Sequence, residues 1–303
     1  MTDTNNAAIN ALDGLAQAML ASVQPLIDAR IEQEIEAQKA KIGVRTIRIE
    51  RNGDETKITG HVHPAFDKVL KLVCAGQNVL LKGPAGCGKT HLASQVAKAL
   101  KKAFASVGGS GGVSESELTG WLLPTGDGGR FEYHPAPFVT IYETGGIFLL
   151  DEVDGFDPNV LLTINQATAN GGFFAAKRGA SGGSPFVKRH AETGIIAACN
   201  TWGNGAGSMY SGRNALDTAF LDRFYPIEMD YDRAYETQLA PDNVCQWVWN
   251  IRERSQAANL RREVSTRMIQ KMALAIEAGI PLAETKADML ASWSKDERAK
   301  IGE

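Results

Sequence analysis

The segment GPAGCGKT, residues 83–90, carries glycines, a lysine and a hydroxyl residue in the spacing GxxxxGK[ST]. Glycines let the backbone N–H groups of such a loop turn inward around phosphate oxygens. We expect Lys89 to reach the β- and γ-phosphates of a nucleotide and the Thr90 hydroxyl to bind Mg²⁺. The residues expected to contact ATP are Gly83, Pro84, Ala85, Gly86, Cys87, Gly88, Lys89, Thr90 and His91.

A strand and a helix are expected on either side of this loop. The apolar run NVLLKG (78–83) precedes it, and the helix-forming run KTHLASQVAKALKKAF (89–104) follows it. A helix that begins at the loop directs its positive N-terminal end at bound phosphate. The string alone could arise by chance, but the strand and the helix are the setting that a phosphate-binding loop requires.

A second group of polar residues follows the apolar run IFLLDEVD, residues 147–154. We expect Asp151 to hold Mg²⁺ and Glu152 to orient and polarise the attacking water. Strands often end in solvated acids, but about sixty residues after a phosphate loop the pair becomes informative. Asn200 ends a third apolar run, and its amide either satisfies buried backbone or holds the water or the γ-phosphate.

The runs 78–83, 146–152 and 194–201 alternate with helical segments, which predicts an α/β fold with a parallel sheet covered by helices on both faces. After FYPIEMDYD the chain is expected to be all-α, forming a lid over the core. The predicted parts are a helical arm at 1–43, a β-hairpin at 44–60, an α/β core at 61–230 and a helical lid at 231–303. The arm either packs on the main domain or pairs with a neighbour.

Composition is ordinary for a globular protein: among 303 residues, 44% are hydrophobic and 22% charged, and the formal net charge is -3. The four cysteines form no CxxC pair, so we expect reduced thiols. The N-terminus lacks the basic and apolar regions of a secretion signal. No apolar stretch approaches the roughly 20 residues that span a bilayer. We therefore expect a cytoplasmic protein with no membrane partner.

Taken in order, the motifs GPAGCGKT, FLLDEVD, AACNT, FLDRF and VSTRMI resemble those of AAA+ ATPases, most of all the MoxR-like group with its CbbQ-like and cobalt-chelatase-like branches. The resemblance covers roughly residues 61–275, and it implies a P-loop NTPase core whose subunits assemble into a ring, generally a hexamer. It also implies a Walker A loop, Walker B acids, a sensor 1 residue, an arginine finger and a sensor 2 arginine. These are residues 83–90, Asp151 with Glu152, Asn200, Arg223 and Arg267, respectively.

Two insertions also resemble those of that group, at residues 120–138 and 171–190. The second is expected to form a hairpin in which Phe173 and Phe174 precede a set of cations without any acid between Gly171 and His190. Such a loop could hold a nucleic-acid backbone or an acidic polypeptide, or it could be a solvated hairpin with an apolar base. The cations are Lys177, Arg178, Lys188 and Arg189.

Three further residues have alternative interpretations. His61 and His63 could suggest a metal site, but without a third ligand nearby we expect them to shape the mouth of the nucleotide pocket, with Val62 and Pro64 against adenine. Arg213 is either a second cation acting on the neighbouring subunit or a surface residue, and we rank it below Arg223.

The function expected from these features is that of an ATPase using ATP and Mg²⁺, with Lys89, Glu152, Asn200 and Arg223 as its catalytic residues. We expect a ring-forming, chaperone-like motor that remodels or matures an unidentified partner protein. One alternative is a nucleic-acid motor or loader that uses the basic hairpin 171–190. Another is an assembly protein that ATP switches between oligomeric states with low turnover. Fold and ATP chemistry are shared across these tasks and do not choose among them.

Overall fold

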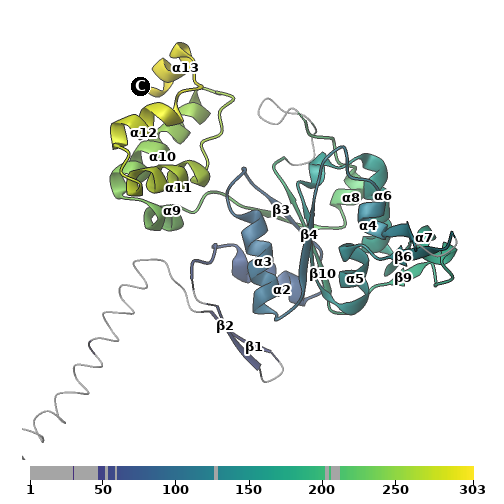
Figure 1. The fold of residues 1–303 in the computed structure, drawn as a ribbon. Helices are drawn as coiled ribbons and strands as arrows, with labels where there is room; N and C mark the ends of the chain where they lie inside the picture. The colour runs from purple at the N-terminus through teal and green to yellow at the C-terminus, as the bar shows by residue number, and fades with distance from the viewer. Residues whose placement is uncertain are drawn as a thin grey trace, which may run out of the picture.

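The computed structural model describes residues 30, 47–51, 54–58, 60–125, 129–201, 205 and 212–303. Apart from Arg30, the arm predicted at 1–43 lies outside the described residues. The strands β1 (Ile47–Arg51) and β2 (Asp54–Ile58) pair antiparallel, with Ile47 opposite Ile58. They precede the main body of the fold (Figure 1).

A five-stranded sheet forms the centre of the core, and neighbouring strands are parallel throughout. This confirms the predicted α/β fold with a parallel sheet. The third and fourth core strands in sequence order, β7 and β10, lie side by side, and the first core strand, β3, lies between β10 and the last one, β11. In spatial order the strands are β11 (Tyr225–Glu228), β3 (Val79–Lys82), β10 (Thr193–Cys199), β7 (Gly146–Asp151) and β4 (Phe104–Gly108).

Both faces of the sheet are buried, because alternate residues of the three central strands, β3, β10 and β7, pack into different hydrophobic clusters. Leu149 and Ile196 face α2 (Phe66–Cys74) and α3 (Lys89–Ala99). Their neighbours Phe148 and Ala197 face the opposite way. The helices on that second face are α4 (Ser116–Thr119), α5 (Pro137–Thr144) and α6 (Pro158–Ala169). Figure 1 shows the two layers on either side of the sheet.

The helix after the phosphate loop is shorter than predicted. It ends at Ala99, Lys101 adopts a left-handed φ of 53°, and Phe104 begins β4 instead of completing the helix. The sequence gives little sign of β4, since this edge strand pairs only with β7 and is not a continuous apolar run.

Two small hairpins extend from the core. The strands β5 (Trp121–Pro124) and β6 (Phe131–His134) pair antiparallel. The strands β8 (Gly172–Phe174) and β9 (Phe186–Lys188) do the same, with α7 (Ala176–Ala180) between them, so the hairpin predicted at 171–190 is confirmed. The remaining core elements are a 3-10 turn, η1 (Val153–Gly155), and α8 (Thr218–Leu221).

The C-terminal part is all-α, as predicted, and has its own hydrophobic core. Trp247, Val248, Ile269 and Trp293 belong to that core. Among the described residues, no helix is long and apolar enough to cross a membrane. The lid helices are α9 (Arg233–Leu239), α10 (Asp242–Ala257), α11 (Thr266–Glu277), α12 (Leu282–Met289) and α13 (Lys295–Ile301).

Candidate functional site

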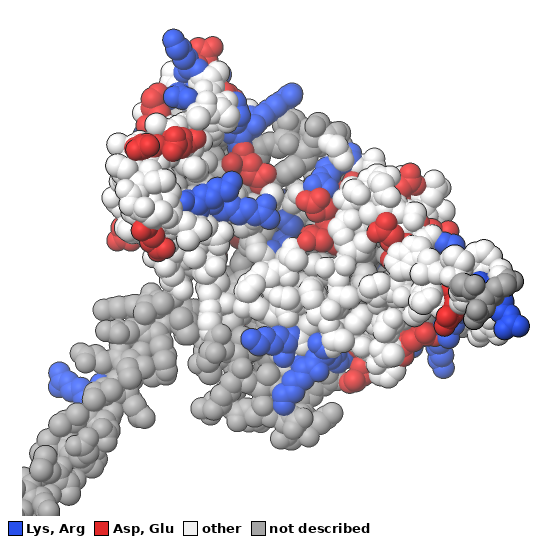
Figure 2. All heavy atoms as spheres, in the orientation of Figure 1, with Lys and Arg blue, Asp and Glu red and all other residues white. Residues whose placement is uncertain are grey.

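A cavity of about 350 Å³ lies where the core meets the lid, a volume in the range of small-molecule sites. The core supplies the loop 83–90 and the carboxyl ends of β7 and β10, and the lid supplies the first turn of α11. The carboxyl edge of a parallel sheet is the usual ligand site in such folds. Figure 2 shows a hollow between lid and core with basic and acidic side chains on its borders.

Two glycines of the loop are required, Gly83 by its surroundings and Gly88 by its backbone conformation. A Cβ on Gly83 would lie 2.4 Å from the carbonyl oxygen of Met229, so no side chain fits there. Gly88 caps the N-terminus of α3 in the left-handed region, with φ 96°, which a residue with a side chain rarely adopts. The backbone therefore has the close turn that brings N–H groups and a helix N-terminus to one point.

Lys89 is buried inside this loop. Its ammonium group donates to the carbonyl oxygens of Gly83, at 2.7 Å, and Pro84, at 3.0 Å. It also donates to Asn200 Oδ1 at 2.8 Å, which brings the ends of β3 and β10 together. Asn200 thus lies beside the predicted phosphate cation, although 111 residues separate the two in the sequence.

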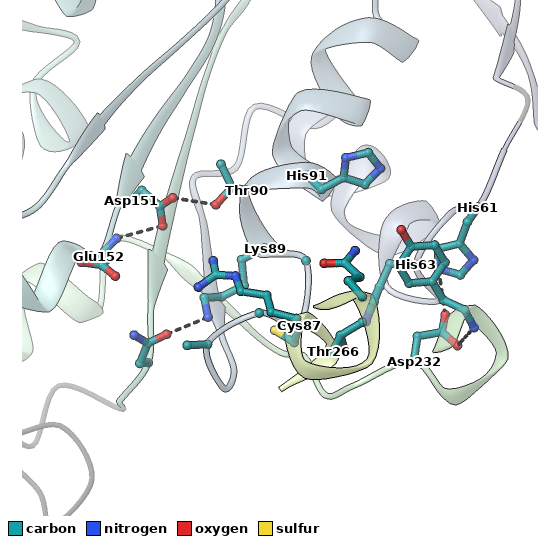
Figure 3. Close-up of a pocket in the computed structure, with 17 residues that line it drawn as sticks. His61, His63, Cys87, Lys89, Thr90, His91, Asp151, Glu152, Asp232 and Thr266 are labelled. Atoms are coloured by element: carbon teal, nitrogen blue, oxygen red, sulfur yellow. Dashed lines mark hydrogen bonds and ion pairs between the residues drawn. The ribbon is translucent and has the colours of Figure 1, made fainter. Parts of the chain in front are cut away.

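Thr90, the last residue of the loop, meets Asp151 at the end of β7, as Figure 3 shows. The Thr90 hydroxyl donates to Asp151 Oδ2 at 2.6 Å, and Asp151 Oδ1 accepts from the backbone N–H of Glu152 at 3.0 Å. A hydroxyl and one carboxylate fit Mg²⁺, which usually takes few protein ligands and completes its shell with phosphates and water. In the part of the chain that is described, no three His, Cys, Asp or Glu side chains gather as a metal cage, at His61 and His63 or elsewhere.

Glu152 follows β7 with a left-handed φ of 50° and leaves its side chain 49% exposed at the cavity. Its Oε2 lies 3.2 Å from Nη2 of Arg213, whose Nη1 lies 3.4 Å from Oδ1 of the fully buried Asp154. The other Asp154 oxygen accepts from Thr201, the residue after Asn200, at 2.9 Å. Arg213 is therefore no isolated surface residue. The sequence did not reveal that Asp154 holds Arg213 beside Glu152.

The lid side of the cavity carries Arg267 together with the two histidines. His61 Nε2 lies 3.1 Å from Asp232 Oδ2, and its ring stacks on Tyr235 with centroids 4.3 Å apart. His61 and His63 line the cavity, but Val62 differs from the expectation, because it is buried in the core cluster beneath α2 and α3.

Cys87 lies in the loop as a buried thiol. Burial raises its pKa, although the neighbouring Lys89 charge acts in the opposite direction. The thiol is therefore neutral at physiological pH and adds no negative charge beside the site of the phosphates.

Arg223 lies apart from the other predicted site residues of its own chain. It follows α8, immediately before β11, and is not among the residues lining the cavity. Its Nη1 donates to the carbonyl of Ala219, and its Nε is buried without a partner among the described residues. Asp217 instead caps α8, accepting from the backbone N–H of Ala219 at 3.0 Å.

Part of the core matches a known family of proteins. The family model described as AAA domain, dynein-related subfamily, matches residues 78–224. The chain is 28% identical over 172 residues to YojN of Bacillus subtilis (strain 168), covering 55% of this chain and 51% of YojN. It is 25% identical over 175 residues to Protein CbbQ of Hydrogenophilus thermoluteolus, covering 56% of this chain and 61% of CbbQ.

A third relative is the denitrification regulatory protein NirQ of Pseudomonas aeruginosa, 35% identical over 95 residues, which are 31% of this chain and 35% of NirQ. The matches therefore span between about a third and three fifths of these relatives. The family model covers the loop, both acids and Asn200, and it ends one residue after Arg223.

Proposed function

We propose that this chain, which belongs to the MoxR-like group of AAA+ ATPases, hydrolyses ATP between its core and its lid and uses that reaction to remodel a partner protein. One observation carries the ATPase part of the proposal. Lys89, Thr90, Asp151, Glu152, Asn200 and, from the lid, Arg267 all line a single cavity.

Each side chain has a role that its position supports. Lys89 binds the β- and γ-phosphates once its ammonium group leaves the loop carbonyls. Glu152 accepts a hydrogen bond from the attacking water and polarises it, and Asn200 orients that water or the γ-phosphate. Arg267 approaches the phosphates from the lid, so that binding draws lid and core together.

Thr90 and Asp151 are the residues that would hold Mg²⁺. When bound, the ion neutralises charge on the β- and γ-phosphate oxygens. The 2.6 Å hydrogen bond between these two side chains brings both oxygens to the same point at the edge of the cavity.

A ring is supported by the position of Arg223. An arginine that does not line the cavity of its own chain can complete the site of a neighbour in a head-to-tail ring. Hydrolysis then changes the lid-to-core angle and moves the hairpins β5–β6 and β8–β9, which carry exposed apolar side chains for a protein partner. Those side chains are Trp121, Leu123, Phe131, Phe174 and Phe186.

Replacing Lys89 with alanine is expected to remove most nucleotide binding. Charge-assisted hydrogen bonds contribute about 1.5–3 kcal/mol each, so the loss is roughly ten- to a hundredfold in affinity. Titration of a fluorescent ATP analogue measures it, with Lys98→Ala, an exposed lysine of the same helix, as the matched control. Equal affinity of Lys89→Ala and wild type would remove the basis of the proposed ATPase.

The nucleic-acid alternative is less well supported by the contacts of the hairpin 171–190. Arg178 pairs with Glu143 at 2.6 Å, and Arg189 is largely buried, donating to Asn78 at 3.0 Å and to the carbonyl of Thr193 at 2.9 Å. Burial also lowers the pKa of Arg189. Lys188 is the exposed member of the set. Figure 2 shows acidic side chains beside basic ones at the end of the molecule that carries β6 and β9.

We therefore expect the wild-type protein to show no salt-sensitive binding to duplex DNA at about 50 mM salt, and no stimulation of its ATPase by DNA. Fluorescence anisotropy with a labelled duplex tests this. Should binding appear, changing Lys177, Arg178, Lys188 and Arg189 to alanine would flatten the salt slope by up to about 0.9 per lost phosphate contact. That result would favour the motor or loader over the remodelling function.

A further inference from the structure

A buried polar network joins the phosphate loop to the start of α11, and none of the roles proposed above uses it. We propose that Tyr231, Arg252 and Glu236 are positioning residues that hold the loop and Arg267 in register across the junction of core and lid. The proposal rests on the proposed function, because it concerns the same nucleotide site.

Glu236 is the centre of the network. It lies on α9, is fully buried, and its carboxylate accepts hydrogen bonds from both α10 and α11. Arg252 of α10 donates from Nη2 to Oε1 at 2.6 Å and from Nη1 to Oε2 at 3.0 Å. Trp249 Nε1 donates to Oε2 at 2.6 Å. Thr266 Oγ1, at the first residue of α11, donates to Oε1 at 2.7 Å.

These donors keep a buried carboxylate charged. Burial alone would raise the pKa of Glu236, but the hydrogen bonds from Arg252, Thr266 and Trp249, together with the Arg252 charge, hold that pKa below its ordinary value. The pair is bidentate and desolvated, so its geometry is tightly defined. Glu236 and Arg252 are therefore suited to fixing the orientation of the side chains that they contact.

The network reaches the core through Tyr231. The Arg252 guanidinium carbon lies 3.9 Å from the centroid of the Tyr231 ring, a cation–π contact. The Tyr231 hydroxyl donates to the carbonyl oxygen of Ala85 at 3.1 Å. Ala85 is inside the phosphate loop and lines the cavity. The Tyr231 hydroxyl thus links the loop to the buried pair of the lid.

At its other end the network reaches Arg267. Thr266, which donates to Glu236, lines the cavity (Figure 3). The next residue, Arg267, lines it too. The start of α11 also lies against the loop: a Cβ on Gly86 would be 3.0 Å from Ser265 Cβ and 3.6 Å from Arg267 Cγ. The loop and Arg267 are therefore connected both by direct packing and by the relay through Tyr231, Arg252 and Glu236.

The consequence is preorganisation of the site. When only part of the population has the loop and Arg267 in register, the apparent affinity for nucleotide falls to that fraction of its full value. Tyr231→Phe removes the hydroxyl but keeps the aromatic ring against Arg252, so the Arg252–Glu236 pair stays shielded from water. Loss of one hydrogen bond is expected to weaken ADP binding about fivefold.

The test is a double-mutant cycle on the full chain, with ADP as the probe and calorimetric titration as the readout. The four proteins are wild type, Tyr231→Phe, Arg267→Ala and the double variant, and Tyr225→Phe, an exposed tyrosine of β11, is the control. We expect Tyr231→Phe to weaken binding in wild type and to have no further effect once Arg267 is absent, because the relay acts through that residue.

Equal losses from Tyr231→Phe with and without Arg267 would overturn the proposal, as would an affinity unchanged by Tyr231→Phe. A lowered melting temperature with unchanged ADP affinity would assign the network to stability alone, which also overturns it. Wild-type protein that binds neither ADP nor ATP would contradict the proposed function itself, and this inference with it. Binding in wild type with additive losses would contradict the inference and leave the proposed function standing.

Discussion

Replacing Arg223 with alanine is expected to lower the ATPase rate by about 10³- to 10⁵-fold, because an arginine supplied to the transferring phosphoryl group has an effect of that size. Negative charge on that group must be stabilised, and no residue other than Arg267 and Lys89 brings a lysine or arginine charge to the described lining of the cavity. Arg223 stands outside that lining. We therefore expect it to act on the neighbouring subunit, so that hydrolysis depends on assembly.

A mixing experiment separates action on the neighbour from action within the chain. Lys89→Ala and Arg223→Ala are each expected to be inactive alone. In a random one-to-one mixture, about a quarter of the head-to-tail interfaces join an intact Lys89 of one chain to an intact Arg223 of the next. Part of the activity should return.

If Arg223 acted within its own chain, every site in a mixed ring would lack either Lys89 or Arg223. No mixed ring would then recover hydrolysis. Size-exclusion chromatography with one tagged variant establishes that joint rings form. A structural role through Asp217 or Asp222 would require an ion pair that Arg223 does not make among the described residues, where Asp217 instead caps α8.

The second large effect concerns Glu152. Changing it to glutamine is expected to leave ATP affinity near wild type and to slow turnover by about 10²- to 10⁴-fold, since a neutral amide cannot polarise water as a carboxylate does. Glutamine preserves the shape of a side chain that is half exposed and contacts Arg213. Phosphate release in single-turnover experiments measures the step directly.

Glu277→Gln, at an exposed position of α11, is the matched control for charge removal and should be fully active. Phosphate release by Glu152→Gln at the wild-type rate would mean that another group orients the water. The slow variant should stay loaded with ATP, and this makes it the protein of choice for capturing the partner from a lysate of the source cells.

The sequence predicted those parts of the site that are local. The loop 83–90 is a contiguous string, and the runs that became β3, β7 and β10 are apolar because both faces of the sheet are covered. The runs of β7 and β10 end in polar residues that line the cavity, Asp151 and Asn200. For these residues, one short stretch of sequence contains both the strand and the functional side chain that follows it. The hydrophobic pattern that predicts the strand therefore also predicts where the side chain lies.

The parts that could not be predicted depend on partners far apart in the chain. Lys89 and Asn200 are 111 residues apart, and Arg178 is neutralised by Glu143, so counting acids within the hairpin overstated its positive charge. Arg213 forms ion pairs with Glu152 and Asp154, which lie about sixty residues earlier in the sequence. The edge strand β4 was missed because only one neighbouring strand pairs with it, which leaves no continuous apolar run to detect.

The separate hydrophobic core of the lid has a consequence for how the protein melts. A cluster that shares no member with the two clusters of the core can open as its own cooperative unit, with a heat-capacity change of its own. A nucleotide in the cavity would contact both units, because both line it. A ligand that binds only when they are together adds RT ln(1 + [L]/Kd) to the free energy of separating them. In a cell rich in ATP the two parts then unfold as one, and in its absence they can unfold separately.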